Sequence, residues 1–93
     1  MYITDAIDIM IKNGYREVPG KVLEYNKENI YVSLRNSIPA ASIYGEHVWF
    51  DVTDNISYTY FSQWIEPVLD AKNFEEYRIL WERAYIADAL EKM

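Results

Sequence analysis

The sequence predicts a single small α+β domain spanning residues 1–93, with the element order α-β-β-β-β-α. Three observations support this fold class. Apolar residues recur at helical spacing near both ends of the chain, and two stretches between them alternate apolar and polar residues around a polar turn. The third observation is the length, because 93 residues bury one hydrophobic core but not two. We therefore expect an antiparallel sheet of about four strands, made of two hairpins, with an N-terminal helix and a longer C-terminal helix packed on it.

The first helix is expected over residues 4–13. Thr4 is suited to cap its N-terminus, and Asp5 favours the positive end of the helix dipole. Its apolar stripe consists of Ile3, Ala6, Ile7 and Met10. The pair Asn13-Gly14 ends the helix, because glycine readily adopts the left-handed conformation that commonly follows a helix C-terminus.

The first hairpin is expected from residues 21–25 and 30–35, which flank the polar loop 26–29. Pairing Tyr25 with Ile30 gives the two strands one apolar and one polar face. The apolar face carries Leu23, Tyr25, Ile30, Val32 and Leu34, and the polar face carries Glu24, Tyr31, Ser33 and Arg35. Residues 36–45 are expected to form a crossing loop, in which Pro39 suits the first position of a single helical turn.

The second hairpin is expected from residues 47–53 and 56–62, around the turn pair Asp54-Asn55. Pairing Thr53 with Ile56 places Val48, Phe50, Val52 and Phe61 on a core-like face. The opposite face is aromatic and polar. On it, Trp49 is expected directly across from Tyr60, and Asp51 across from Tyr58.

Residues 63–72 form an apolar connector, and Asn73 followed by Glu76 marks the start of the last helix, from about Phe74 to Glu91. This helix has a broad inner apolar face and a second stripe, Ile79, Ile86 and Leu90, roughly opposite to it. The second stripe has two explanations. Its side chains either lie singly at the surface or between packed elements, or they form the seam of a homodimer or a contact with a partner protein.

The formal net charge is −6, and its position along the chain is informative. Residues 1–45 hold five acids and five bases, so the second half of the chain carries the whole net charge. The stretch from Glu46 to Asp70 contains five acids and no lysine or arginine. Such a stretch repels polyanions and favours basic partners, so direct binding to nucleic acid is not expected.

Few kinds of site chemistry are compatible with this composition. The chain has one histidine and no cysteine, which excludes the usual zinc sites, thiolate nucleophiles and disulfides. His47 has Ser37 and Ser42 nearby in sequence, but neither serine lies in a glycine elbow. We therefore expect that this protein is not an enzyme and that it has no catalytic residue, no metal site and no cofactor. No run approaches the ~20 apolar residues of a membrane span, and the N-terminus lacks a signal-peptide pattern, so we expect a cytoplasmic protein.

The predicted function is that of a non-enzymatic acidic protein-binding module. Tyrosine and tryptophan supply much of the binding energy at protein interfaces, and surrounding carboxylates select a basic partner. We expect Trp49, Asp51, Tyr58 and Tyr60 to form the centre of the binding surface and Glu46, Asp54 and Glu66 its acidic rim. The chain would then occlude a basic nucleic-acid-binding surface of its target, as small acidic phage and mobile-element proteins do when they disable restriction or CRISPR machinery.

Two alternative functions remain open on the sequence alone. In the first, a small ligand or signalling nucleotide binds in an aromatic pocket between the sheet and the last helix. Tyr77, Trp81 and Tyr58 would contact it, with Arg35, Arg78 and Arg83 as the available cations. In the second, the chain is a structural or assembly protein that dimerises through Ile79, Ile86 and Leu90. The site also depends on which sheet face meets solvent, since a helix packed over Trp49 and Tyr60 would make them core residues.

Overall fold

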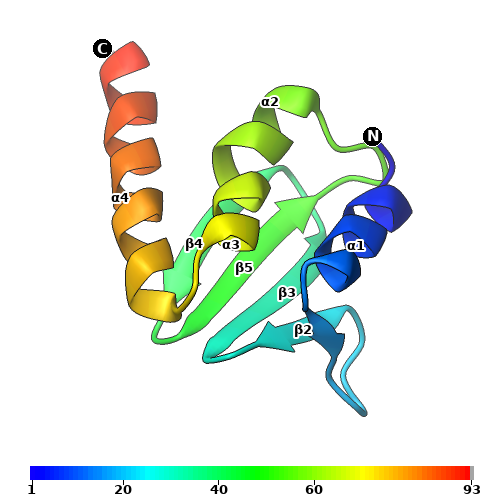
Figure 1. Ribbon diagram of the computed structural model, residues 1–93. Coiled ribbons are helices and arrows are strands. Elements are labelled where there is room, and N and C mark those ends of the chain that lie inside the picture. The colour runs from blue at the N-terminus through cyan, green and yellow to red at the C-terminus, as the bar shows by residue number, and fades with distance from the viewer. Residues whose placement is uncertain (93) are drawn as a thin grey trace.

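The computed structural model describes residues 1–92, which form a five-stranded mixed sheet with helices (Figure 1). The strands are β1 (Arg16–Glu17), β2 (Glu24–Lys27), β3 (Ile30–Asn36), β4 (Ala40–Tyr44) and β5 (His47–Val52), in the spatial order β1-β2-β3-β5-β4. The helices are α1 (Ile3–Lys12), α2 (Tyr58–Tyr60), the π-helix η1 (Phe61–Ile65), α3 (Glu66–Asp70) and α4 (Phe74–Glu91). Because α2, η1 and α3 follow one another without a break, they form one helical segment. The predicted α+β class is confirmed.

The predicted four-stranded antiparallel sheet is wrong in strand number and in strand direction. Residues 40–44, expected in a crossing loop, form β4 and pair antiparallel with β5. The two-residue turn Gly45-Glu46 joins these strands, and Gly45 has a φ of 62°, which glycine adopts without strain. Strand β5 then lies parallel to β3, with Ser33 level with Trp49.

The second predicted hairpin does not form, because residues 58–70 are helical. Ser57 caps the start of this segment, where its Oγ accepts a hydrogen bond from the backbone N–H of Tyr60 at 3.1 Å. Phe61, Ile65 and Val68 follow at helical spacing and are all buried, so the segment packs as an amphipathic helix. Tyr58 and Tyr60 therefore do not lie across a strand pair from Asp51 and Trp49.

The middle of the helical segment has π geometry, because the backbone N–H of Glu66 bonds five residues back to the carbonyl of Phe61. The next residue, Pro67, has no N–H, so the carbonyl of Gln63 lacks the donor an α-helix would supply.

The first hairpin forms as predicted except for its register. Lys27 pairs with Ile30 and Tyr25 with Val32, two residues away from the predicted pairing. The turn is the pair Glu28-Asn29, with a φ of 54° at Glu28. A shift of two residues keeps every side chain on its predicted face. Tyr25, Ile30, Val32 and Leu34 are accordingly buried, and Leu23 is half-buried just before the strand.

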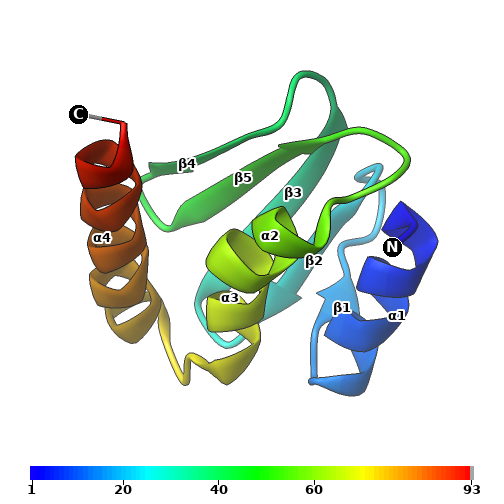
Figure 2. The same cartoon turned by 90° about the horizontal axis from the view of Figure 1, so that it is seen from above.

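The bounds of the two terminal helices agree with the prediction to within one residue. The predicted packing of the C-terminal helix on the sheet is wrong, because α4 packs on η1 and α3 instead. The amide group of Asn73 caps α4, because its Oδ1 accepts a hydrogen bond from the N–H of Glu76 at 2.9 Å. Helix α1 and the segment from α2 to α3 lie on the same side of the sheet, and α4 stands beyond the β4 edge (Figures 1 and 2). The core lies between this helical side and the sheet, with Val32, Val48 and Phe50 fully buried at its centre. None of the helices within residues 1–92 is long and apolar enough to cross a membrane.

Candidate functional site

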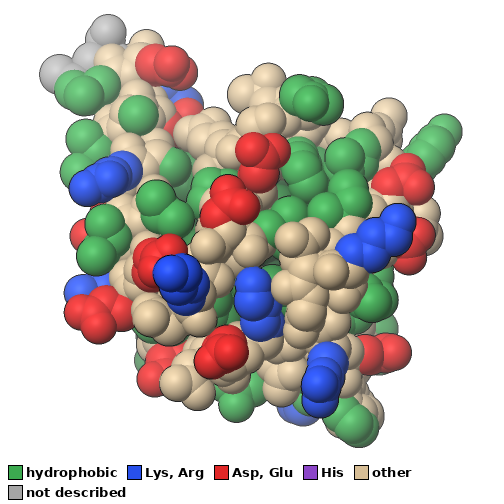
Figure 3. All heavy atoms as spheres, in the orientation of Figure 1, with side chains coloured by type: hydrophobic (Ala, Val, Ile, Leu, Met, Phe, Trp, Pro, Cys, Tyr) green, Lys and Arg blue, Asp and Glu red, His purple; other side chains and the backbone are tan. Residues whose placement is uncertain are grey.

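The sheet face turned away from the helices carries polar and aromatic side chains in three rows set by the strand register. The first row contains Arg16, Asn26, Tyr31, His47 and Tyr44; the second contains Glu24, Ser33, Trp49 and Ser42; the third contains Arg35, Asp51 and Ala40. The helical side, shown in Figure 3, has acidic and basic side chains interspersed, with hydrophobic side chains along α4 and between the α2–α3 segment and α1, and the single histidine is not visible from it. The uncovered sheet face carries the rings of Tyr31, Tyr44, His47 and Trp49.

Trp49 lies at the centre of a stack on this face. The ring of His47 is stacked on the indole, with centroids 4.2 Å apart and planes within 8° of parallel. The guanidinium of Arg35 lies 4.6 Å from the centroid of the Trp49 ring. His47 comes two residues before Trp49 along β5, and Arg35 is level with Asp51, two residues after it. The two neighbours therefore take opposite sides of the indole along the strand.

Hydrogen bonds tie both ends of this stack to the sheet. Arg35 donates two bonds to Asp51, from Nε to Oδ1 at 2.6 Å and from Nη2 to Oδ2 at 3.0 Å. At the other end, Ser33 Oγ and His47 Nε2 are hydrogen-bonded at 2.7 Å. Planar bidentate bonds to a carboxylate fix the orientation of an arginine. We call Ser33, Arg35, His47, Trp49 and Asp51 the sheet-face stack, and its side chains are held in place before any partner binds.

Within residues 1–92, no third side chain orients, through a hydrogen bond, the histidine that is bonded to Ser33. Nucleophilic serine catalysis needs a third group that orients the histidine and donors that stabilise an oxyanion. Among residues 1–92, Ser33 is the only side chain hydrogen-bonded to His47, and Ser33 itself is 6% exposed on a flat sheet. In the same residues, no three His, Asp or Glu side chains gather closely enough to hold a metal ion.

The predicted central residues separate into two groups. Trp49 and Asp51 belong to the sheet-face stack. Tyr60 lies on the helical side, edge-on to Phe50 at 6.4 Å, with its hydroxyl donating to the carbonyl of Ala40 at 2.6 Å. Burial, and to a lesser degree the charge of Asp51, raises the pKa of Tyr60 well above its usual value. Tyr58 is 79% exposed at the start of α2 and lies outside the stack.

The predicted acidic rim is spread over the molecule. Glu46 lies in the β4–β5 turn, Asp54 lies beyond the opposite end of β5, and Glu66 begins α3. The six residues of β5 separate the first two by roughly 20 Å. Asp51 is ion-paired, because the parallel pairing brings Arg35 from the neutral half of the chain beside it. The acids of residues 46–70 therefore do not form one uncompensated surface.

Sequence reasoning missed Ser33, Arg35 and His47 of the sheet-face stack, and also Tyr31 and Tyr44 beside it. The alternation of the first hairpin did place Ser33 and Tyr31 on its polar face, and the alternation of β5 placed Trp49 on the matching face. What the sequence did not indicate was the parallel pairing that joins the two faces. Tyr44 was missed because β4 was expected to be a loop.

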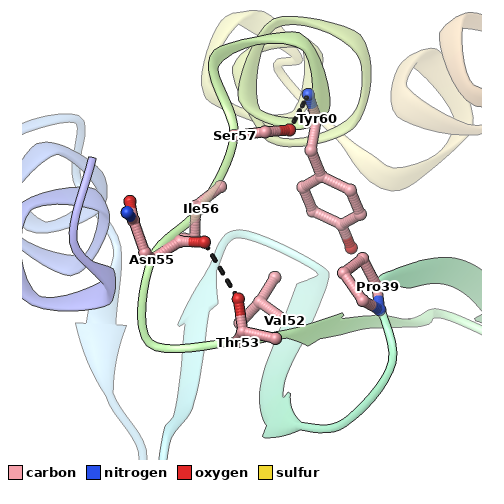
Figure 4. A pocket seen from close by; sticks show the side chains of 7 residues that line it. All are labelled: Pro39, Val52, Thr53, Asn55, Ile56, Ser57 and Tyr60. Atoms are coloured by element: carbon pink, nitrogen blue, oxygen red, sulfur yellow. Dashed lines mark hydrogen bonds between the residues drawn. The ribbon is translucent and has the colours of Figure 1, made fainter.

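Two of the hollows in the described part of the chain bear on the predicted ligand site. The first, between the end of β5 and α2, has a volume of about 80 Å³. Figure 4 shows it between Pro39, Tyr60 and the loop that carries Thr53 and Asn55, with the Tyr60 N–H bonded to Ser57 and Thr53 Oγ1 bonded to the Asn55 carbonyl. It is several times smaller than the roughly 300–1,000 Å³ of ligand pockets.

The second hollow is a groove of about 280 Å³ between the start of β4, the segment α2–η1 and the C-terminal half of α4. We call it the β4–α4 groove, and it is lined by Pro39, Ala40, Ala41, Tyr60, Trp64, Tyr85, Asp88 and Lys92. Trp81 lies between Trp64 and Tyr85, with ring centroids 5.7 Å and 5.2 Å away, and its buried Nε1 has no hydrogen-bond partner within the described residues. Of the residues predicted to contact a small ligand, Tyr77 is buried in the core and Tyr58 is not at the groove.

The predicted dimer seam lies on the exposed side of α4. Ile79, Ile86 and Leu90 are all exposed in the single chain, and Tyr77 is the only fully buried residue of this helix.

No protein-family model matches this chain, and no similar protein was found among curated proteins or solved structures.

Proposed function

We propose that this chain is a non-enzymatic binding module whose uncovered sheet face contacts another protein. The observation that supports this most is the sheet-face stack, because it combines tryptophan and arginine in a fixed arrangement on a face without a covering helix. Tryptophan, tyrosine and arginine are the residues most enriched at the energetic centres of protein interfaces.

The fixed arrangement lowers the cost of binding. Ordering a flexible side chain at an interface costs about 0.5–1.5 kcal/mol. Arg35, His47 and Trp49 are already held by stacking and hydrogen bonds, so a partner would order few further groups on this face. Tyr31 and Tyr44 flank His47 in the first row and are 38% and 83% exposed. Their rings supply apolar contact area next to the stack.

The charge favours a partner with a basic surface. The net charge of the whole chain is −6. On the uncovered face itself, Arg16 and Arg35 offset Glu24 and Asp51, so the attraction comes from the chain as a whole, and Glu46 in the turn beside the face adds to it. A chain that binds such a surface acts as an inhibitor when the surface normally holds nucleic acid. Direct stacking of bases on this face is disfavoured, because both sides of the Trp49 indole already have neighbours.

The test compares three variants as bait for partners from a lysate of the native host. Tyr44→Ala and Trp49→Ala remove exposed and stacked aromatic rings of the sheet face, and Tyr58→Ala removes an equally exposed ring on the helical side. We expect the wild type and Tyr58→Ala to capture the same partner and the two sheet-face variants to lose it. Binding of the captured partner should also weaken as salt is added, because salt screens the attraction between charges. Equal capture by all four proteins would contradict the proposal.

A further inference from the structure

The two edges of the sheet differ in how well they are protected from pairing with another strand. The β1 edge has only two residues, Arg16 and Glu17, and both are charged. The β4 edge has five residues, Ala-Ala-Ser-Ile-Tyr, with no charge and no proline. Natural sheets block their edges with short strands, charges, prolines or bulges, or cover them with a helix or loop. Strand β4 has none of the first four devices, and the helix beyond it, α4, is separated from it by the β4–α4 groove.

The hydrogen bonds of β5 show which groups of β4 are free. The carbonyls of Glu46 and Val52 accept from the N–H groups of Tyr31 and Ser37, so the even-numbered positions of β5 face β3. The odd-numbered positions face β4, where Tyr44, Ser42 and Ala40 are their partners. Residues alternate along a strand, so Ala41 and Ile43 point their N–H and C=O groups away from β5. Within residues 1–92, these four groups have no hydrogen-bond partner.

The β4–α4 groove lies beside this free edge. Ala41 lines it, together with the rings of Tyr60, Trp64 and Tyr85. Two contacts support its walls: Tyr60 bonds to the Ala40 carbonyl, and Asp88 and Lys92 of α4 form an ion pair at 3.0 Å. Successive side chains of a strand point to opposite faces, so every second side chain of a strand added to β4 would enter this groove.

From these observations we infer that the β4 edge binds an extended segment of another protein by strand addition. The segment pairs with Ala41 and Ile43 through their free backbone groups and places an apolar side chain among Tyr60, Trp64 and Tyr85. Main-chain hydrogen bonds supply affinity in this mode of recognition, and the side-chain pocket supplies specificity.

A single extended segment fits this place better than a second copy of the chain. Helix α4 stands beyond the β4 edge on the helical side, so the space between them is bounded (Figures 1 and 2). Antiparallel pairing of the β4 strands of two copies would bring both α4 helices to the same side of the junction. The inference concerns a different surface from the sheet-face stack and does not depend on the function proposed for it.

The probe is a library of short peptides in which threonine alternates with a randomised residue, selected on the wild-type chain. The decisive variant is Ala41→Pro. It removes one outward N–H and no bond to β5. Because proline is tolerated at such edge positions, the variant is expected to fold. Tyr85→Ala opens the groove wall. Trp49→Ala and Tyr58→Ala serve as controls, and thermal unfolding checks that each variant is folded.

We expect enriched peptides with apolar residues at the randomised positions, and a loss of affinity of about tenfold in Ala41→Pro, as expected for one lost hydrogen bond. Tyr85→Ala should bind them more weakly and both controls as well as wild type. The inference is overturned by no enrichment, or by equal binding to folded Ala41→Pro. It is also overturned if the wild type has twice the mass of one chain and Ala41→Pro halves it, because a second copy then occupies the edge. If Trp49→Ala still binds the peptides, peptide binding at the β4 edge does not depend on the sheet-face stack. A failure of the sheet-face proposal can then be told apart from a failure of strand addition.

Discussion

Two tyrosines in the core, Tyr15 and Tyr77, should make the stability of this domain strongly dependent on alkaline pH. They are 1% and 0% exposed, and their hydroxyls donate to the carbonyls of Val68 at 3.1 Å and of Trp64 at 3.4 Å. Burial raises the pKa of both hydroxyls well above the usual value, and at Tyr77 the charges of Tyr15 and Tyr60 add to this effect. A phenolate could neither donate these bonds nor be solvated in the core.

The sign and size of the effect follow from proton linkage. In the unfolded chain, tyrosine loses its proton near pH 10, whereas in the folded chain these two remain protonated well above that pH. Their contribution is therefore fully present below about pH 10 and is lost as the pH rises toward the folded-state pKa values. Each group lowers the free energy of unfolding by about 1.4 kcal/mol per pH unit in that window, so these two together lower it by nearly 3 kcal/mol per pH unit.

Urea unfolding at a series of pH values from 8 upward, followed by tryptophan fluorescence, measures this slope. Tyr77→Phe keeps the ring and removes the titrating hydroxyl. We expect this variant to lose about 1 kcal/mol or less at pH 8, because the bond to Trp64 is long, and to show a slope shallower by about 1.4 kcal/mol per pH unit. Identical slopes in the wild type and Tyr77→Phe would refute the reasoning.

Four further substitutions have expected outcomes. Phe50→Ala should lower the free energy of unfolding by about 3–5 kcal/mol in urea titrations, because Phe50 is fully buried in the core. Gly45→Ala should cost about 1–2 kcal/mol, seen as a lower melting temperature, because an L-residue is strained at a φ of 62°. Arg35→Ala should cost less than about 1 kcal/mol, since the Arg35 side chain is half exposed in its pair with Asp51, and a much larger loss would show that the stack stabilises the fold. The predicted seam on α4 requires that Ile86→Glu reduce the mass measured by light scattering to the 11.1 kDa of one chain, and an unchanged mass contradicts the seam.

The sequence predicted the elements whose signals are local. Helix α1 and helix α4 have apolar spacing, and α4 begins at the predicted cap Asn73. The N-cap of α1 is Tyr2, so the prediction of Thr4 as its cap is wrong. The β2–β3 hairpin has alternation on both sides of a polar turn. The error of two residues in the hairpin register did no harm, because side chains repeat with a period of two along a strand.

The sequence did not predict the centre of the sheet, because the pairing of β3 with β5 joins segments that are not neighbours along the chain. The region 56–62 was misassigned for a related reason. Over a few residues, Tyr58 and Tyr60 on one face and Phe61 on the other fit the alternation of a strand. Over a longer range, Phe61, Ile65 and Val68 follow the spacing of a helix.

The candidate site was predicted in part. Alternation along β5 placed Trp49 and Asp51 together on a face away from Val48 and Phe50, and the structure agrees. The arginine that neutralises Asp51 and covers one side of Trp49 comes through the parallel pairing, so the local charge seen along the sequence overstated the charge of the surface.

The central claim is that the uncovered sheet face is where this chain meets its partner. Nuclear magnetic resonance mapping of the isotope-labelled chain, titrated with the partner captured in the experiment above, tests it most directly. We expect the largest shift changes at Ser33, His47 and the Trp49 indole, with the helical side unchanged. Shift changes confined to Tyr58 and Glu66 on the helical side, with the sheet-face stack unaffected, would contradict it.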